Sequence, residues 1–189
     1  MPAAEVDLEV PADAVSLLVL GHGAGGDVTA PDLSGVRDAA LAARVAVARI
    51  TQPYRVAGRR APPPAPRLDD AWVEACAGLP RLGPWIVGGR SSGARVACRT
   101  ARTVGAVGVV ALAFPLHPPG KPEVSRDAEL DTGLPTLVVN GDRDPFGVPA
   151  VRPGMELAVR SGERHDLRRD PAAIGEIVVD WLRRHHWAA

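Results

Sequence analysis

The sequence predicts an α/β fold in which a mostly parallel β-sheet carries helices on both faces. Short runs of apolar, often β-branched residues alternate along the chain with longer, Ala-rich segments of helical character. Strands that alternate with helices at this spacing are typical of α/β sheets. Several of the runs are continuously apolar, as expected for strands that are buried on both faces.

Each element has its own local signal. Strands are predicted at Val6–Val10, Ser16–Leu20, Val45–Ile50, Trp85–Gly88, Ala106–Ala113, Thr136–Asn140 and Met155–Val159. Helices are predicted at Pro31–Ala43, Leu68–Gly78, Ser92–Thr103 and Pro171–Arg184, with a short helical turn at Pro149–Arg152. Pro31 suits the first turn of a helix, and Asp170 followed by Pro171 combines a capping residue with a first-position proline. The proline-rich segment RRAPPPAPR is predicted to be a stiff surface connection.

Length and composition indicate one domain, residues 1–189, with a sizeable core, since 46% of the chain is hydrophobic. The formal net charge is zero and no basic stripe with aromatic residues is present, so a nucleic-acid partner is not expected. The N-terminal segment does not resemble a signal peptide, and no apolar stretch reaches the roughly 20 residues of a membrane span. Cys76 and Cys98 lack metal-ligand spacing and suit core positions in a reducing compartment. We therefore expect a cytoplasmic protein without a metal site.

A first glycine-rich loop follows the strand at Ser16–Leu20. Gly21, Gly23 and Gly26 satisfy G-x-G-x-x-G, the spacing that holds a dinucleotide pyrophosphate at a helix N-terminus. Here the next helix is predicted to begin only at Pro31, and the strand after it ends without the Asp or Glu that binds a ribose. Arg49, on that strand, is the one residue that could bind the extra phosphate of NADP. A dinucleotide-binding protein is therefore the weaker alternative.

A second glycine-rich turn, Gly89 to Gly93, has the sequence GRSSG between a predicted strand and a predicted helix. G-x-S-x-G in this context places a serine on a sharp turn above the sheet, where its hydroxyl is a nucleophile. The alternative is a purely structural turn in which the serine only caps the helix. Ser91 fits the frame and Ser92 does not, so Ser91 is the candidate nucleophile.

A nucleophilic serine needs a base and a carboxylate that orients the base. Where the serine lies on a strand–turn–helix turn of this kind, they follow it in the order acid, then histidine. The strand at Thr136–Asn140 leads into a turn with Asp142 and Asp144. Asp144 is the candidate acid, whereas Asp142 is expected to hold the turn through backbone N–H groups.

Histidine candidates for the base are weighed by their place in the chain. His165 follows the strand at Met155–Val159, which matches the required order, so it is the candidate base. His117 lies at another strand end and is the second candidate, while His22 is expected to brace the first glycine loop. His185 and His186 end the last helix, where a cation suits the helix dipole, and are expected at the surface.

The chain resembles a compact α/β-hydrolase of the dienelactone-hydrolase-like, "predicted α/β-hydrolase" branch. The motifs HGAGG, GGRSSGAR, FPLHPPGKPE, NGDRDPFG and GERHDL carry the resemblance, which extends over nearly the whole chain. The segment PLHPPGKPE makes it similar to testis-expressed hydrolase-like proteins and to a subunit of a histone-acetyltransferase complex. The resemblance implies that the backbone N–H groups of Ala24 and Ser92 form an oxyanion hole. Candidate pocket residues are His22, Gly23, Arg90 and His117.

Together these observations predict a serine hydrolase that cleaves a carboxylester or thioester of a small-molecule acyl substrate, through an acyl-enzyme and without a cofactor. Only about 20 residues separate Phe114 from Pro135, which is too short for an inserted helical cap domain, so an open site is expected. A non-catalytic binding or scaffold protein with a hydrolase body is the alternative from another class, because a fold does not establish a function.

Overall fold

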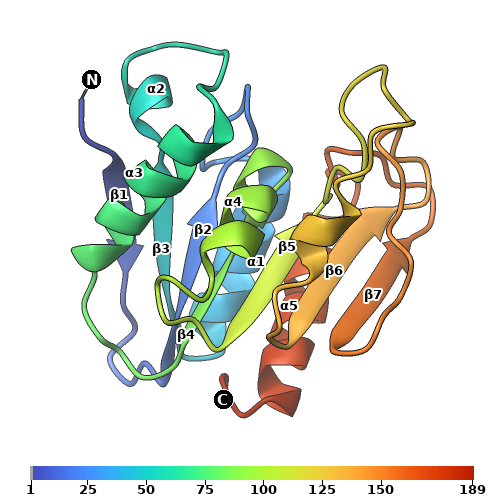
Figure 1. The fold of residues 1–189 in the computed structure, drawn as a ribbon. Helices are drawn as coiled ribbons and strands as arrows, with labels where there is room; N and C mark the ends of the chain where they lie inside the picture. Colours follow the sequence, from blue (N-terminus) through green and yellow to red (C-terminus); the bar gives the residue numbers. More distant parts are fainter. Residues whose placement is uncertain (1) are drawn as a thin grey trace.

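The computed structural model describes residues 2–189 and contains one seven-stranded sheet with the order β1-β3-β2-β4-β5-β6-β7 (Figure 1). The strands are β1 (Glu5–Glu9), β2 (Ser16–Gly21), β3 (Val45–Thr51), β4 (Trp85–Arg90), β5 (Gly108–Leu112), β6 (Thr136–Gly141) and β7 (Met155–Arg160). The helices are α1 (Pro31–Ala42), α2 (Pro53–Val56), α3 (Ala65–Ala77), α4 (Ser92–Thr100), the short 3-10 helix η1 (Asp127–Leu130) and α5 (Pro171–Arg184).

All neighbouring strands from β3 through β7 run parallel, and only the edge strand β1 is antiparallel to its neighbour β3. The carboxyl ends of the parallel strands therefore meet at one edge of the sheet, the upper edge in Figure 1. The loops at this edge carry every residue that the sequence assigns to the relay of serine, acid and histidine. The predicted fold class is confirmed.

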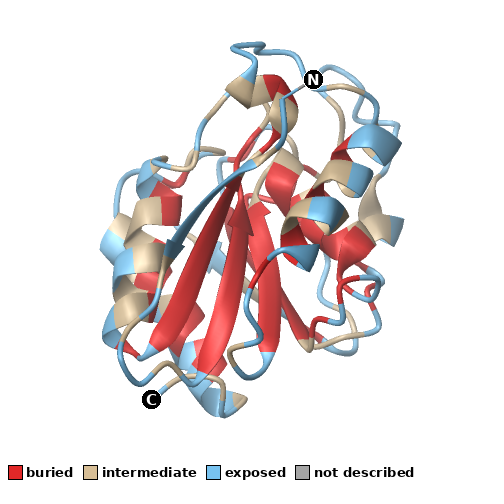
Figure 2. Cartoon of the chain, turned by 90° about the vertical axis from the view of Figure 1, so that its left-hand side faces the viewer, coloured by how far each residue is buried: buried red, intermediate tan, exposed pale blue. Residues whose placement is uncertain are grey.

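The sheet separates two hydrophobic layers, and the alternation of side chains along β2 shows how. Leu17 and Val19 pack on the face covered by α3 and α4, where Trp72 is fully buried. Leu18 and Leu20 pack on the opposite face with Trp181 of α5. Because both faces are covered, the central strands are buried throughout, whereas the edge strand β1 is exposed (Figure 2).

Two glycines allow α1 and α5 to pack closely on the second face. A Cβ atom on Gly35 would lie 2.1 Å from the carbonyl oxygen of Pro171, and one on Gly175 would lie 2.4 Å from the carbonyl oxygen of Gly35. Both atoms belong to the backbone, so a side chain at either position would push the helices apart. The α1–α5 pair positions the last helix and the loop that precedes it, which contains His165.

Several element boundaries differ from the predicted ones. Pro149–Arg152 forms no helical turn, and the four-residue helix α2 was not predicted. Helix α3 begins at Ala65, within the proline-rich segment, because prolines are tolerated in a first turn. Helix α4 ends at Thr100 and β5 is shorter than expected.

The connection between β5 and β6 contains η1 as its only helix, so no cap domain is inserted at this point of the described chain. Cys76 and Cys98 are buried and unpaired. Burial raises the pKa of both thiols to about 12, which makes them inert core side chains.

Candidate active site

The turn between β4 and α4 holds Ser91 in a strained conformation. Its φ is 52° and its ψ is −109°, a region that side chains rarely adopt. The Ser91 N–H donates to the carbonyl of Leu112 on β5 over 2.9 Å. A Cβ atom on Gly89 or on Gly93 would lie 2.4 or 2.3 Å from the carbonyl oxygen of Gly21. The two glycines therefore let the turn pack against the end of β2, as the G-x-S-x-G pattern predicts.

A continuous hydrogen-bond relay links the serine to a buried carboxylate. The Ser91 hydroxyl lies 2.9 Å from Nε2 of His165, and Nδ1 of the same ring lies 2.8 Å from Oδ2 of Asp144. Nδ1–H donating to Asp144 leaves Nε2 free to accept the serine proton. The Asp144 side chain is fully buried and 19% of the His165 side chain is exposed, so the ring is reachable from solvent.

Asp144 is held in place by its own turn. Its second oxygen, Oδ1, accepts the N–H of Phe146 over 2.8 Å, and the Phe146 ring packs edge-on against the His165 ring at a centroid distance of 4.4 Å. Asp142 accepts the N–H of Gly162 over 2.7 Å, so it ties the turn after β6 to the turn after β7. Asp142 does bond a backbone N–H, but the expectation that it holds its own turn is wrong, because the turn that it caps is the one after β7.

Arg90, the variable residue of the G-x-S-x-G turn, joins the serine turn to the histidine loop. Its Nε donates to Oδ2 of Asp32 over 2.9 Å, and its Nη2 donates to the backbone carbonyl of His165 over 2.8 Å. Asp32 lies in the first turn of α1 with its side chain completely buried. Burial raises the pKa of Asp32, and the charge of Arg90 opposes that rise.

The first glycine loop is braced by His22. Its ring nitrogen Nδ1 lies 2.8 Å from the carbonyl oxygen of Gly23, and its Nε2 accepts the N–H of Gln52 over 3.0 Å. These partners require the neutral tautomer with the proton on Nδ1. Burial lowers the pKa of His22, which favours the same neutral form. Because no helix begins within the loop and α1 begins at Pro31, the geometry required for dinucleotide binding is not present.

Tyr54 of α2 fixes the tip of the same loop. Its hydroxyl donates to the carbonyl of Ala24 over 2.6 Å, and burial raises the pKa of Tyr54 to about 12, so the phenol is a permanent donor near neutral pH. Within residues 2–189 the N–H groups of Ala24 and Ser92 have no acceptor. Both residues line the cavity that contains Ser91, so both amides remain available to a ligand.

The relay opens into a cavity of about 520 Å³, a size suited to a small organic ligand. The lining residues are Gly23, Ala24, Gly25, Gly26, Pro62, Arg90, Ser91, Ser92, Arg95, Pro115, Pro119, Arg126, Phe146 and His165. The structure thus brings together Ser91, His165 and the predicted pocket residues Gly23 and Arg90, with Asp144 directly behind the histidine. His22 lies behind the loop without lining the cavity.

His117 is not part of this cavity, so the expectation that it lines the pocket is wrong. Its Nδ1 lies 3.3 Å from the carbonyl oxygen of Val124, within its own connection. Asp32, Tyr54 and Arg126 were not predicted from the sequence. The only sequence signal for Asp32 was its place after a helix-starting proline, which is equally typical of a helix-dipole partner.

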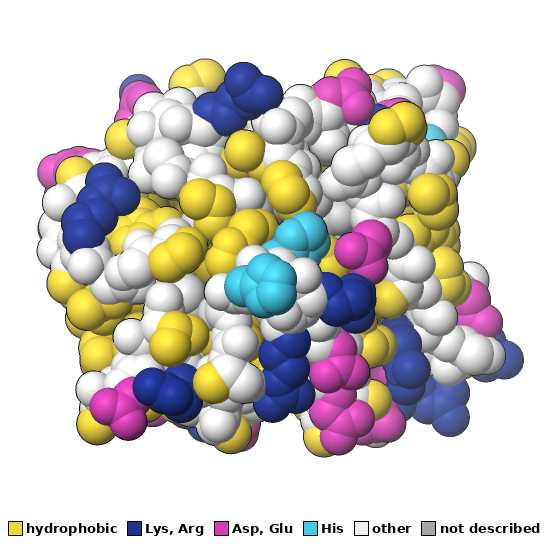
Figure 3. Space-filling view, turned by 90° about the horizontal axis from the view of Figure 1, so that it is seen from below, with side chains coloured by type: hydrophobic (Ala, Val, Ile, Leu, Met, Phe, Trp, Pro, Cys, Tyr) yellow, Lys and Arg dark blue, Asp and Glu magenta, His cyan; other side chains and the backbone are white. Residues whose placement is uncertain are grey.

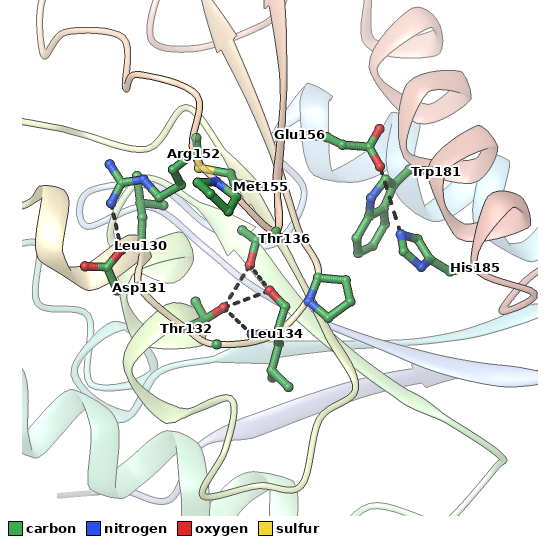
Figure 4. A pocket seen from close by; sticks show the side chains of 14 residues that line it. Leu130, Asp131, Thr132, Leu134, Thr136, Arg152, Met155, Glu156, Trp181 and His185 are labelled. Carbon is green, nitrogen blue, oxygen red and sulfur yellow. Dashed lines mark hydrogen bonds and ion pairs between the residues drawn. The ribbon is translucent and has the colours of Figure 1, made fainter.

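A second, larger cavity of about 680 Å³ lies where β6 and β7 begin, at the opposite end of the strands. Figure 3 views the molecule from this end and shows histidine side chains beside hydrophobic and basic ones. In Figure 4 the polar groups of the cavity pair with one another: Thr132 with Thr136 over 2.9 Å and Arg152 with Asp131 over 2.9 Å. Glu156 and His185 also line this cavity and lie 4.0 Å apart, but among its described lining residues there is no serine or cysteine.

The ends of the chain confirm part of the expectation for the two C-terminal histidines. His186 is exposed, but His185 is half-buried and stacks on Trp187 at a centroid distance of 4.6 Å.

Among residues 2–189, no group of three His, Cys, Asp or Glu side chains is arranged to hold a metal ion. No helix in that part of the chain is long and apolar enough to cross a membrane.

The fold and this arrangement at the carboxyl edge of the sheet define an α/β-hydrolase. The family model of the alpha/beta hydrolase domain matches residues 14–162, and the chain belongs to this family. No protein with a curated description is similar enough in sequence to match.

Solved structures share the fold at low sequence identity. Est1E from Butyrivibrio proteoclasticus is 14% identical with a TM-score of 0.74, covering 97% of this chain and 94% of that chain. A dienelactone hydrolase from Anabaena variabilis is 18% identical with a TM-score of 0.73, covering 96% and 91%. XC6422 from Xanthomonas campestris, described as an α/β serine hydrolase without a lid, is 18% identical with a TM-score of 0.72, covering 96% and 89%.

Proposed function

We propose that the protein, acting as a single domain, is a serine hydrolase that cleaves carboxylesters or thioesters of small acyl substrates. The observation that carries the proposal is the relay from the Ser91 hydroxyl through His165 to Asp144, with distances of 2.9 and 2.8 Å. Each of the three side chains follows a different parallel strand, so the sheet holds the relay in place without a ligand.

In the proposed reaction Ser91 attacks the substrate carbonyl while Nε2 of His165 takes the hydroxyl proton. Asp144 keeps the proton of the ring on Nδ1 and stabilises the imidazolium that forms. The tetrahedral intermediate expels the alcohol or thiol, which receives the proton from His165. Water then attacks the acyl-serine with His165 as the base, the bond to the Ser91 oxygen breaks, and His165 returns the proton to that oxygen as the acid is released. All of these groups belong to the chain, so the reaction needs no metal or organic cofactor.

The developing oxyanion is bound by the N–H groups of Ala24 and Ser92. Both N–H groups lack an acceptor in the described chain, and both residues line the cavity. One such donor lowers the barrier by about 3 kcal/mol in a comparable site. Tyr54 and His22 support this function indirectly, because their hydrogen bonds hold the loop of Ala24 in one conformation.

The proposal is tested with a fluorophosphonate probe, which reacts only with an activated serine, and with p-nitrophenyl acetate as substrate. We expect Ser91→Ala to abolish labelling and to lower turnover by at least about 10³-fold. Ser161→Ala is the matched control, since Ser161 is exposed on the turn after β7 and lies outside the cavity. Labelling of Ser161→Ala should equal that of the wild type.

The alternative of a non-catalytic scaffold predicts another outcome. Wild-type protein that is folded but neither labelled nor active on esters or thioesters would favour the scaffold. Labelling of Ser91→Ala at the same rate as the wild type would contradict the assignment of Ser91 as the nucleophile.

A further inference from the structure

The charged side chains that line the active-site cavity are basic. Among residues 2–189, three arginines line the cavity, Arg90, Arg95 and Arg126, and no carboxylate does. The remaining lining residues are three glycines, two serines, three prolines, Ala24, Phe146 and His165. A cavity with this lining offers an anion more than it offers a cation.

Two of the three arginines are neutralised by acids of the protein. Arg90 pairs with the buried Asp32. Arg95 makes a two-pronged contact with Glu129, with Nε–Oε2 and Nη2–Oε1 distances of 2.8 and 2.6 Å. A planar guanidinium that is already paired with both oxygens of a carboxylate has little capacity for a second anion.

Arg126 differs from the other two. In the described chain its side chain contacts no carboxylate, and only its Nη1 makes hydrogen bonds, which are long: 3.5 Å to the carbonyl oxygen of Pro115 and 3.4 Å to that of His117. Its Nε and Nη2 have no protein acceptor, and both are donors in a planar fork.

The surroundings of Arg126 compensate its charge only in part. Glu129 is shared by Arg95 and Arg99, and Arg99 also pairs with Asp69. With Arg126, three guanidinium groups in this region are matched by only two carboxylates. Burial and then the charge of Arg95 lower the pKa of Arg126, and the charge of Glu129 opposes them. By contrast, the hydrogen bond to Asp127 raises the pKa of Arg152 outside the cavity.

We propose that the natural substrate is an ester or thioester that also carries a carboxylate, and that Arg126 binds this carboxylate. The inference rests on the proposed hydrolase function, since Arg126 and Ser91 line the same cavity. A carboxylate accepts two parallel N–H bonds from a guanidinium, which matches the two free donors of Arg126. Pro119 and Phe146 supply apolar walls for the hydrocarbon between the carboxylate and the reacting carbonyl.

Two matched substrate pairs test the inference. The first is 4-acetoxybenzoate against 4-acetoxybenzamide, and the second is monomethyl adipate against the methyl ester of adipic acid monoamide. Within each pair an uncharged amide replaces the carboxylate at nearly constant size. We expect kcat/KM of the wild type to favour the carboxylate in at least one pair by about tenfold or more, the effect of one charged hydrogen-bonded contact.

Variants of Arg126 assign the preference to this side chain. Arg126→Gln should lower the ratio of the two kcat/KM values to near unity, Arg126→Lys should restore it in part, and Arg126→Glu should reverse it. The ratio is read from one preparation, so it does not depend on the fraction of folded protein. Arg67→Gln is the control for total charge, because Arg67 is exposed on α3 and does not line the cavity.

The outcomes separate this inference from the proposed function. Equal or better hydrolysis of the amide partners by the wild type would overturn the inference and leave the serine hydrolase intact. A preference that survives Arg126→Gln, or that falls equally in Arg67→Gln, would also overturn it. Protein that labels with fluorophosphonate but hydrolyses neither pair contradicts the inference alone. Absence of both labelling and hydrolysis contradicts the proposed function and the inference with it.

Discussion

Replacing Arg90 by Met should destabilise the protein and do so most strongly at high pH. The substitution keeps much of the length of the side chain but removes both of its hydrogen bonds, one to Asp32 and one to the carbonyl of His165. Asp32 then remains as a carboxylate with no exposed surface and without its cationic partner. Breaking a buried pair in this way is much more costly than removing the whole pair.

The magnitude follows from the burial of the two partners. Loss of one member of a buried pair costs about 3–5 kcal/mol, and the lower figure applies because water reaches part of Arg90. Its side chain is 14% exposed, whereas that of Asp32 is completely buried. In a chain of this length 1 kcal/mol corresponds to about 2–4 °C in Tm, so we expect a fall of about 6–12 °C at pH 8.

The pH dependence has a definite sign. Burial already raises the pKa of Asp32 in the folded protein, and removing Arg90 raises it further. The folded state of the variant then binds a proton more readily than the unfolded state. Its stability is therefore lost as pH rises from the ordinary pKa of aspartate to the raised one, and is regained on acidification.

The assay is thermal unfolding of wild type and variant at pH 8 and pH 5. Arg90→Met combined with Asp32→Asn is the matched control. In the wild type the N–H of Leu33 donates to Asp32 over 2.9 Å; the amide oxygen of Asn can accept the same bond and carries no charge. The double variant should recover much of the lost Tm and should lose the difference between the two pH values. A fall below about 3 °C at pH 8, or an equal fall at both pH values, would refute the reasoning.

Three further predictions concern the relay and its supports. Asp144→Asn should lower kcat by up to about 10⁴-fold, since an amide does not stabilise the imidazolium. Asp142→Asn keeps an oxygen acceptor and should change kcat little. Comparing kcat of the two variants at matched Tm distinguishes the roles of the two aspartates. Tyr54→Phe should lower stability by about 1 kcal/mol and reduce kcat more than it changes KM, because the oxyanion loop loses its anchor; unchanged kinetics would show that the loop is fixed without it. Gly93→Ala should prevent folding or displace the elbow, since its Cβ would lie 2.3 Å from a backbone oxygen, while Gly25→Ala, with nothing within 4 Å, should fold normally as judged by Tm.

The strands could be predicted because burial on both faces leaves a plain pattern. The run that begins at Thr136 is apolar up to Asn140, and the structure ends β6 only one residue later, at Gly141. The helix α2 could not be predicted, since four residues are too few to show a period. The turn expected at Pro149–Arg152 did not form, and Arg152 instead extends to Asp127 and Asp131, far away in the sequence.

The candidate site was predictable only where chain order carries information. Ser91, Asp144 and His165 each follow a strand, so parallel topology alone places them at one edge of the sheet. The partners that hold them are different in kind. Asp32 meets Arg90 across 58 positions, a pairing that no local spacing indicates.

The rims of the reactive cavity are stiff and uncovered. Pro62, Pro115 and Pro119 have fixed φ angles, and no inserted domain follows β5. An acyl group on Ser91 would therefore face bulk solvent throughout its lifetime, and a dissolved alcohol or amine would compete with a vast excess of water. For the proposed acyl-enzyme, this geometry therefore favours hydrolysis over transfer of the acyl group to another acceptor.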